Sequence, residues 1–173
     1  MTDEILKLNL GCGNKNLEGY VNVDLVEERK GVKPDVLCDV RDLSGYFSDN
    51  VADEVLAVHI LEHFYPWEVH DILKEWKRVL KPGGKIVIEV PDLMKAIFHL
   101  LANPENARLS MWALYGNPRE RDPLMCHKWG YNKQSLCMEL HLAGFENFTQ
   151  APAQFKLKDL RDMRIEAYKP VVM

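Results

Sequence analysis

The chain has 173 residues, a length that fits one domain, and we expect a single domain over residues 1–173. Hydrophobic residues make up 47% and charged residues 28%, which indicates a globular protein and excludes a disordered or fibrous one. The net charge of −4 and the lack of any run of five like charges exclude a chain that tracks nucleic acid. Its apolar stretches are all shorter than the roughly 18 residues that a membrane span needs.

The cysteines and the first residues predict a cytoplasmic protein. Cys12, Cys38, Cys126 and Cys137 are scattered without Cys-x-x-Cys spacing, so we expect thiols in a reducing compartment. The chain opens with Met-Thr-Asp-Glu and not with the basic region and apolar core of a secretory signal.

Five short runs rich in Val, Ile and Leu predict the strands of a mostly parallel sheet buried on both faces. They are residues 5–10, 20–25, 35–40, 54–59 and 85–90. Between the last two runs, Pro66 opens a helix whose apolar residues recur every 3.6 positions. This helix ends at Pro82-Gly83.

After the fifth run the alternation of strands and helices breaks, and residues 92–131 predict a helical lid or insert. Asp92 can cap a first lid helix. Asn103-Pro104 can start a second lid helix, which runs to Tyr115.

The C-terminal part predicts one more helix and a hairpin. Asn132 caps a helix that ends at Gly144. Residues 145–155 and 160–168 can pair as a terminal hairpin.

The turn after the first strand is the most informative feature of the chain. Gly11 and Gly13 flank Cys12 where an apolar run ends, and such a turn lets the backbone pass close to a ligand. Asp24 ends the next run, where an acid can accept both hydroxyls of a ribose. Glycines and a strand-ending aspartate also occur in ordinary turns, so this pattern alone leaves a purely structural role open.

The spacing of these signals departs from that of dinucleotide-binding folds. Asp24 lies 11 positions beyond Gly13, whereas those folds place the acid about 20 positions on, with a helix between. Residues 14–19 are too few for a parallel crossover helix, which takes about a dozen residues or more. We therefore expect either a loop in place of the first crossover helix or a different pairing of the first two strands.

Six segments of the chain carry a family resemblance. They are LNLGCG at 8–13, NVD at 22–24, CDV at 38–40, ADEVLAVHILEHF at 52–64, RVLKPGGKIVIEVP at 78–91 and HKWGYNKQSLCMELHLAGF at 127–145. In this order they resemble the class I S-adenosylmethionine-dependent methyltransferases, and within them the type 11 branch. The resemblance implies a Rossmann-like α/β fold with antiparallel sixth and seventh strands and S-adenosylmethionine as the cofactor. It also implies methyl transfer to a small molecule or to a terminal group of a glycan or lipid.

The resemblance implies which residues hold the cofactor. Nine positions are concerned: Asn9, Gly11, Cys12, Gly13, Asp24, Leu25, Asp39, Val40 and His59. The glycine turn corresponds to the methionine part, Asp24 to the ribose, and Asp39 with the Val40 amide to the adenine edge. Asn9 stands where the family usually has an acid, so it can hydrogen-bond to the cofactor's ammonium but cannot pair with its charge. Asp39 also fits a plain turn carboxylate.

His59, Glu62 and His63 match the His-x-x-Glu-His pattern of some zinc proteases. That pattern needs a helix from which both histidines face the metal, whereas the residues before it predict a strand and Pro66 places the helix later. We therefore predict no metal here, with a metal-dependent hydrolase as an alternative. Some related quinone-biosynthesis methyltransferases hold a divalent cation at this place, with a Glu where this chain has His59, so a cation beside the acceptor is a second alternative.

His127 lies just before the last predicted helix, where related proteins put a polar residue near the transferred methyl. Methyl transfer from a sulfonium is an in-line displacement, and a neutral imidazole can take a proton from a hydroxyl acceptor near pH 7. We predict that His127 is the catalytic base, and a histidine hydrogen-bonded in a lid turn fits the sequence equally. Four aromatic residues either form an acceptor wall or belong to the core: Trp112, Tyr115, Trp129 and Tyr131.

The acceptor is the least specified part of the function. We expect a small-molecule acceptor and no nucleic-acid partner, and a homodimer stays open because a second subunit can help to cover the pocket. A non-catalytic module that binds S-adenosylmethionine or a nucleoside is the main alternative. Asn9 and the missing first helix favour that alternative.

Overall fold

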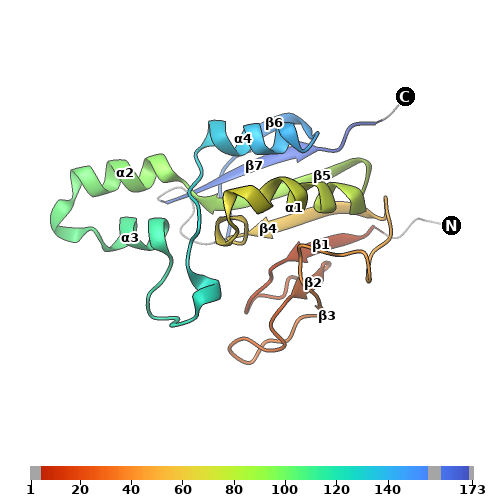
Figure 1. Ribbon diagram of the computed structural model, residues 1–173, viewed down its shortest axis with the longest axis horizontal. Helices are drawn as coiled ribbons and strands as arrows, with labels where there is room; N and C mark the ends of the chain where they lie inside the picture. Colours follow the sequence, from red (N-terminus) through yellow and green to blue (C-terminus); the bar gives the residue numbers. More distant parts are fainter. Residues whose placement is uncertain (1–4, 156–160, 172–173) are drawn as a thin grey trace.

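The computed structural model describes residues 5–155 and 161–171, and its centre is one seven-stranded sheet (Figure 1). The strands lie in the order β3-β2-β1-β4-β5-β7-β6. In chain order they are β1 (Lys7–Leu10), β2 (Val21–Asp24), β3 (Val36–Leu37), β4 (Ala52–Val58), β5 (Leu80–Pro91), β6 (Glu146–Ala151) and β7 (Asp162–Tyr168). β1 to β5 pair in parallel, and β7 pairs antiparallel with both β5 and β6. The expected Rossmann-like α/β fold with a C-terminal antiparallel hairpin is thus confirmed.

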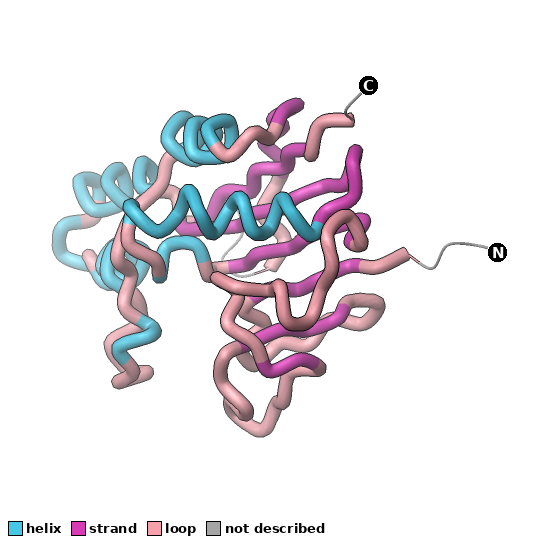
Figure 2. Tube along the Cα trace, turned by 45° about the vertical axis from the view of Figure 1, so that its right-hand side comes forward, coloured by secondary structure: helices cyan, strands magenta, loops and turns pink. Residues whose placement is uncertain are grey.

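A loop joins β1 to β2 in place of a crossover helix. The two strands pair in parallel, with Leu8 opposite Val21. Residues 11–20, all of them described, form turns and no helix, and Figure 2 shows loops joining the strands at this end of the sheet. Asn22 stabilises the loop from inside, because its side-chain oxygen accepts the Leu17 amide at 2.8 Å. Of the two possibilities that the spacing left, the loop is the correct one.

The two faces of the sheet differ in character. One face packs against α1 (Pro66–Val79) and α4 (Lys133–Leu142), which lie in front of the sheet in Figure 1. Its strand residues belong to the apolar core: Leu8, Leu10, Val23, Val55, Ala57, Ile86, Ile88, Ile165 and Ala167. The alternate positions carry polar residues such as Asn9, Glu54 and Glu89, although Leu56 and Val87 are also buried there. The central strands are thus buried on both faces as expected, but one of these faces carries polar residues.

The second face contains two charge pairs, one of them buried. Glu54 pairs with Lys85 at 3.0 Å, and Glu89 pairs with Arg164 at 3.1 Å. Among the described residues, no helix lies in the chain between β1 and β4. This face therefore combines polar side chains with a stretch of chain that contributes no helix to cover it.

The junction between α1 and β5 differs from the sequence prediction. α1 begins at Pro66 as expected, but β5 starts directly after the helix at Leu80 and not at residue 85. Leu80 pairs with Ala52, and the register then shifts. Pro82 has no amide to donate to a ladder, so the extended chain continues through an irregularity and not through a separate turn.

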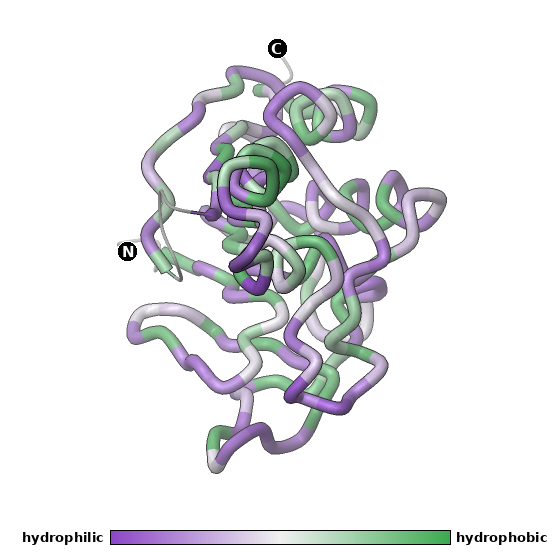
Figure 3. The backbone as a smooth tube through the Cα atoms, turned by 90° about the vertical axis from the view of Figure 1, so that its left-hand side faces the viewer, coloured by the Kyte–Doolittle hydropathy of each residue, from purple (hydrophilic) through white to green (hydrophobic). Residues whose placement is uncertain are grey.

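The lid consists of short helices at one end of the sheet, and Figure 3 views the molecule from that side. They are α2 (Leu93–Ala102), η2 (Pro104–Asn106), α3 (Arg108–Tyr115) and η3 (Pro123–Met125). Asp92 caps α2 as predicted, since it accepts the Met94 amide at 2.9 Å. The expected second helix is interrupted: its first turn is the 3₁₀ helix η2, and Ala107, which stays in the helical region of φ and ψ, joins η2 to α3.

The C-terminal elements follow the prediction with small differences in their bounds. Asn132 caps α4 by accepting the Ser135 amide at 2.9 Å, and α4 ends at Leu142, before Gly144. β6 and β7 form the expected hairpin, and the predicted strand start at residue 160 lies outside the described residues. Within the described ranges, no helix is long and apolar enough to cross a membrane.

Candidate functional site

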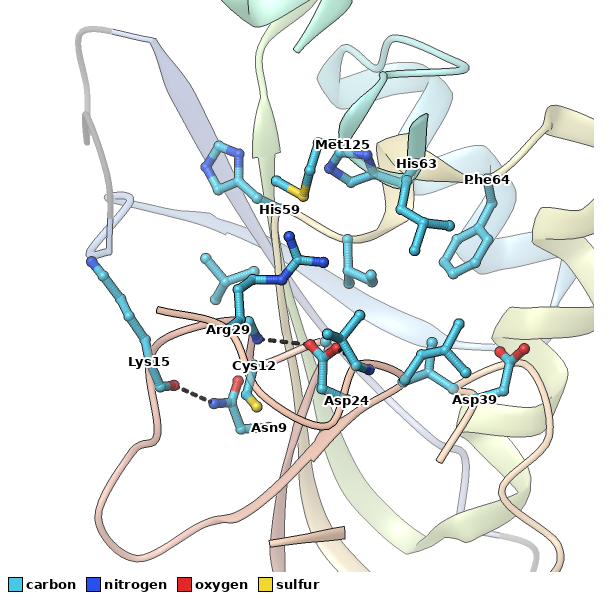
Figure 4. A pocket seen from close by; sticks show the side chains of 18 of the residues that line it. Asn9, Cys12, Lys15, Asp24, Arg29, Asp39, His59, His63, Phe64 and Met125 are labelled. Atoms are coloured by element: carbon cyan, nitrogen blue, oxygen red, sulfur yellow. Dashed lines mark hydrogen bonds between the residues drawn. The ribbon is translucent and has the colours of Figure 1, made fainter. Parts of the chain in front are cut away.

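The carboxyl ends of β1, β2 and β4 border a cavity of about 350 Å³. All nine positions predicted to contact the cofactor line it: Asn9, Gly11, Cys12, Gly13, Asp24, Leu25, Asp39, Val40 and His59. Figure 4 shows the side chains of Asn9, Asp24 and His59 around this space. The structure brings these residues together, and their contacts with a cofactor stay predictions.

The turn after β1 requires glycine. Gly11 has a φ of +66°, and a Cβ at this position would lie 2.7 Å from side-chain carbons of Ile60, just after β4. Gly13 also takes a left-handed φ, of +59°. Between them, burial first and then the charge of Asp24 raise the pKa of the Cys12 thiol to about 12. Cys12 therefore packs as an unreactive thiol.

Asp24 is held in a fixed orientation at the end of β2. Its Oδ2 accepts the Gly13 amide at 2.8 Å, and its Oδ1 accepts the Val26 amide at 2.9 Å. The residue is only 8% exposed. A carboxylate oxygen can accept more than one hydrogen bond, so both oxygens can also receive a ligand hydroxyl without changing position.

Asn9 links the cavity to the loop that replaces the first helix. Its Nδ2 donates to the Lys15 carbonyl at 3.1 Å, drawn as a dashed line in Figure 4, and to Asn22 Oδ1 at 2.9 Å. Both protons of the amide are thereby used. The amide oxygen is left to accept a hydrogen bond from a ligand, which suits an ammonium group.

Asp39 and Val40 form a turn that is anchored on both sides. The guanidinium of Arg41 binds the Asp39 carboxylate, with Nη2 2.6 Å from Oδ2. These hydrogen bonds lower the pKa of Asp39. The Val40 carbonyl accepts the indole N–H of Trp76, a fully buried residue of α1, at 2.8 Å. Asp39 thus does stabilise the turn in which it lies, through its hydrogen bonds with Arg41. An adenine amine would donate to a carboxylate that Arg41 also contacts.

Sequence reasoning did not identify four cationic side chains that line the cavity: Lys15, Arg29, Arg41 and Lys128. Arg29 also reaches the lid, where its Nη1 lies 3.4 Å from Asp122 Oδ2. The only local feature that could have indicated a role for Arg41 in the site was its position directly after Asp39 and Val40. Arg29 and Asp122 are 93 positions apart, so no local pattern predicts their contact.

A buried cluster of imidazoles and carboxylates lies where β4 ends. His59, with a left-handed φ of +54°, places Nδ1 3.1 Å from Glu62 Oε1 and Nε2 3.1 Å from Asp162 Oδ2. Burial alone would raise the pKa of Glu62, but the close contact with His59 and the charges of His63 and His127 outweigh it and hold that pKa below its usual range. Neither Glu62 oxygen has a well-aligned hydrogen-bond donor among the described residues, so the imidazole charges are what favour its ionised form.

His127 lies behind this cluster and not on the cavity wall. Its Nδ1 lies 2.9 Å from the Ala113 carbonyl, and its Nε2 lies 3.8 Å from Glu62 Oε1. The ring contacts that of His63 edge-on, with 4.9 Å between centroids, and His63 is the member that lines the cavity. Burial lowers the pKa of His127, and Glu62 opposes this only in part. The imidazole is therefore neutral near pH 7, as a base requires.

Glu62, His63 and His127 place possible metal-ligand atoms within 4.8 Å of one another. This set differs from the sequence pattern because His127, from the lid, takes the place of His59. η1 (Leu61–His63) is a single turn after β4, so His59 and His63 do not share the helix that a zinc protease needs. The absence of a bound metal stays a prediction.

The four predicted aromatic residues do not line the cavity at the strand ends. Tyr131 is 1% exposed and belongs to the core, as the alternative stated. Trp129 is about half exposed. Trp112 and Tyr115 line a second hollow on the lid. The lid instead contributes to the cavity through Leu124, Met125 and Lys128.

Comparison with known proteins identifies the type of domain. Residues 8–88 match the family model described as a methyltransferase domain. No curated protein matches the sequence. A SAM-dependent methyltransferase from Methanosarcina mazei is 16% identical, with a TM-score of 0.68, over 99% of this chain and 95% of that one.

Two further structures share the fold. A SAM-dependent methyltransferase from Archaeoglobus fulgidus is 19% identical, with a TM-score of 0.64, over 95% of this chain and 86% of that one. The 1,6-didemethyltoxoflavin-N1-methyltransferase of Burkholderia thailandensis, solved with 1,6-didemethyltoxoflavin and S-adenosylhomocysteine, is 16% identical, with a TM-score of 0.63, over 95% of this chain and 71% of that one. At these identities the likeness establishes the fold.

Proposed function

We propose that the chain is a class I S-adenosylmethionine-dependent methyltransferase of the type 11 branch, with S-adenosylmethionine as its cofactor, and that it methylates a small molecule or a terminal group of a glycan or lipid. The observation that carries the proposal is the gathering of nine cofactor positions around one cavity at the strand ends. Ligands of open α/β sheets bind at that edge.

We assign the cofactor contacts along the sheet edge. Asp24 accepts the ribose hydroxyls with a carboxylate already fixed by Gly13 and Val26. Asp39 and the Val40 amide bind the adenine edge. The turn from Gly11 to Gly13 and the oxygen of Asn9 hold the methionine end, where one hydrogen bond replaces the usual ion pair.

The residues around the acceptor have to align it and exclude water. When bound, S-adenosylmethionine supplies an electrophilic methyl group on a sulfonium. Leu124 and Met125 bring apolar lid surface to the cavity, and Phe64 lines it from the β4 side. Such enclosure favours an in-line approach of the acceptor atom, which contributes through proximity and orientation.

We assign proton removal from the acceptor to the imidazole pair above Glu62. Because His127 does not line the cavity, the proton would leave the acceptor through His63 and pass to His127, which burial keeps neutral by lowering its pKa. His63 is the member of the pair that faces the cavity. Glu62 lies within 3.8 Å of His127 and stabilises the imidazolium that forms when the proton is taken.

Binding and turnover test the proposal separately. Titration calorimetry should give a 1:1 complex with S-adenosylhomocysteine, and labelled S-adenosylmethionine should transfer its methyl to a member of a panel of sugars, lipids and quinols. Lack of binding would contradict the cofactor assignment. Binding with no transfer across the panel, and no slow cofactor hydrolysis, would favour the non-catalytic module.

The working location and assembly are also proposals. We propose a cytoplasmic enzyme, which is supported by four cysteines that all carry free thiols. A homodimer, in which a second subunit helps to cover the cavity, stays open. Light scattering at several concentrations distinguishes a monomer from a homodimer.

A further inference from the structure

A second hollow lies on the lid, beside the cavity that holds the cofactor positions. It is formed by α3 and by the segment that follows it as far as Cys126. Three arginines line it, together with two of the aromatic residues predicted to contact the acceptor: Arg108, Arg119, Arg121, Trp112 and Tyr115. In a chain with a net charge of −4, this is a local concentration of positive charge.

The carboxylates near this hollow are engaged elsewhere. Glu120 pairs with Lys30 at 2.9 Å, and Asp122 pairs with Arg29 at 3.4 Å. In the part of the chain that the structure describes, no carboxylate lies within ion-pair distance of any of the three arginines. One carboxylate, that of Asp122, also lines the hollow, but it pairs with Arg29 outside it, so the hollow keeps an excess of positive charge.

Two of the arginines contact the same tryptophan. The guanidinium carbons of Arg108 and Arg119 lie 4.4 Å and 5.9 Å from the centre of the same Trp112 ring. Arg121 has a left-handed φ of +50°, a conformation that costs energy in a residue with a side chain. An anion in the hollow would meet guanidinium groups that have no carboxylate partner among the described residues. Guanidinium forks match the geometry of phosphate and carboxylate oxygens.

The hollow is next to the site of methyl transfer. Only η3 (Pro123–Met125) separates the two, and Met125 lines both. In Figure 4, Met125 lies beside His59 and His63 at the lid side of the cavity. A molecule with an anionic group in the hollow can thus reach across Met125 toward His63.

We propose that this hollow binds an oxyanion group, phosphate or carboxylate, of the methyl acceptor. The acceptor is then an anionic small molecule, whose part next to the charge contacts Trp112 and Tyr115. This inference rests on the proposed function and adds the chemical class of the substrate. It also explains why two of the predicted aromatic residues are absent from the cofactor cavity.

The test uses simple probes on the full chain saturated with S-adenosylhomocysteine. Calorimetric titration with phenyl phosphate and with benzoate should give binding, whereas neutral benzyl alcohol should bind at least 10-fold more weakly. The stronger of the two anions distinguishes a phosphate acceptor from a carboxylate one. Arg119→Gln and Arg121→Gln should each weaken the binding of that anion by about 10-fold, the loss of one charge-assisted contact.

Matched controls separate this inference from the proposed function. Lys74→Gln removes one exposed positive charge from α1, away from the hollow, and should bind the probe like the parent. All three variants should keep their affinity for S-adenosylhomocysteine. Failure of the parent to bind S-adenosylhomocysteine contradicts the proposed function. Two results would overturn the oxyanion site: anions that bind no better than benzyl alcohol, or arginine variants that bind the anion as well as Lys74→Gln does. An oligonucleotide that displaces the probe and binds several protein molecules per strand would also overturn it, because the positive charge would then serve nucleic acid.

Discussion

Replacing Asp24 with alanine should weaken the affinity for S-adenosylhomocysteine by about 10- to 100-fold. Both carboxylate oxygens are already fixed by the amides of Gly13 and Val26, so the ribose hydroxyls meet an acceptor that loses little freedom on binding. A hydrogen bond to a charged group contributes about 1.5–3 kcal/mol, and each 1.4 kcal/mol corresponds to about a tenfold change in affinity. Titration calorimetry at constant salt measures the difference.

Asp35 provides the matched control. Its Oδ2 accepts the backbone amide and the side-chain amide of Asn22, both at 2.8 Å, but it does not line the cavity. Asp35→Ala therefore removes a carboxylate with comparable structural bonds, and we expect both variants to melt earlier than the parent. If Asp35→Ala loses as much affinity as Asp24→Ala, or if Asp24→Ala binds like the parent, the ribose assignment is wrong.

Three further predictions address the chemistry and the glycine turn. His127→Ala should keep its affinity for S-adenosylhomocysteine and lose about 10²- to 10⁴-fold in turnover. In the parent, the rate should fall on acidification through a midpoint below the ordinary imidazole pKa of about 6.5, because burial lowers the pKa of His127. Turnover within a few-fold of the parent, or a midpoint above that value, would make this histidine structural. Elemental analysis after dialysis should find no stoichiometric zinc, whereas zinc retained by the parent and lost in Glu62→Gln and His63→Gln would contradict the metal-free site. Gly11→Ala should lose about 1–3 kcal/mol of stability and also cofactor affinity, because its Cβ would lie 2.7 Å from a side chain. Gly19→Ala, at a φ of +79° with open space around it, should lose stability alone. Equal cofactor affinities in the two variants would refute the close approach of the backbone to the cofactor at Gly11.

The cofactor side of the site could be predicted because its signals are local. Each position lies at or just after the end of a strand, as with Asp24 after Val21–Val23 and His59 after β4. Parallel strands bring their carboxyl ends to one edge of the sheet, so sequence order alone places these residues together. The short connection after Gly13 was also visible as a missing helix, although only the pairing of β1 with β2 decided what replaced it.

The acceptor side could not be predicted to the same depth, because it depends on contacts between distant segments. Glu62 meets His127 across 65 positions, and which of two histidines faces the cavity depends on how the lid lies against η1. The amides of Lys128 and Trp129 bind the Glu62 carbonyl, which sets that arrangement, and no pattern around either residue indicates it. The sequence pattern therefore grouped His59 with Glu62 and His63, whereas the fold adds His127 to that cluster.

The break between η2 and α3 was missed for a different reason. Apolar spacing from Asn103 to Tyr115 fits one helix, and the interruption depends on the backbone of a single alanine. Likewise, Pro82 and Gly83 are typical of a turn, yet pairing with β4 and β7 keeps this segment extended. In the second case tertiary contacts override a local preference.

A crystal structure of the protein with S-adenosylhomocysteine is the most direct test of the central claim that this cavity is the cofactor site. We expect the ribose hydroxyls on Asp24, the adenine edge on Asp39 and Val40, and the sulfur on the side of the cavity lined by His63 and Met125. A ligand bound elsewhere, or bound here with its ribose away from Asp24, would contradict the account.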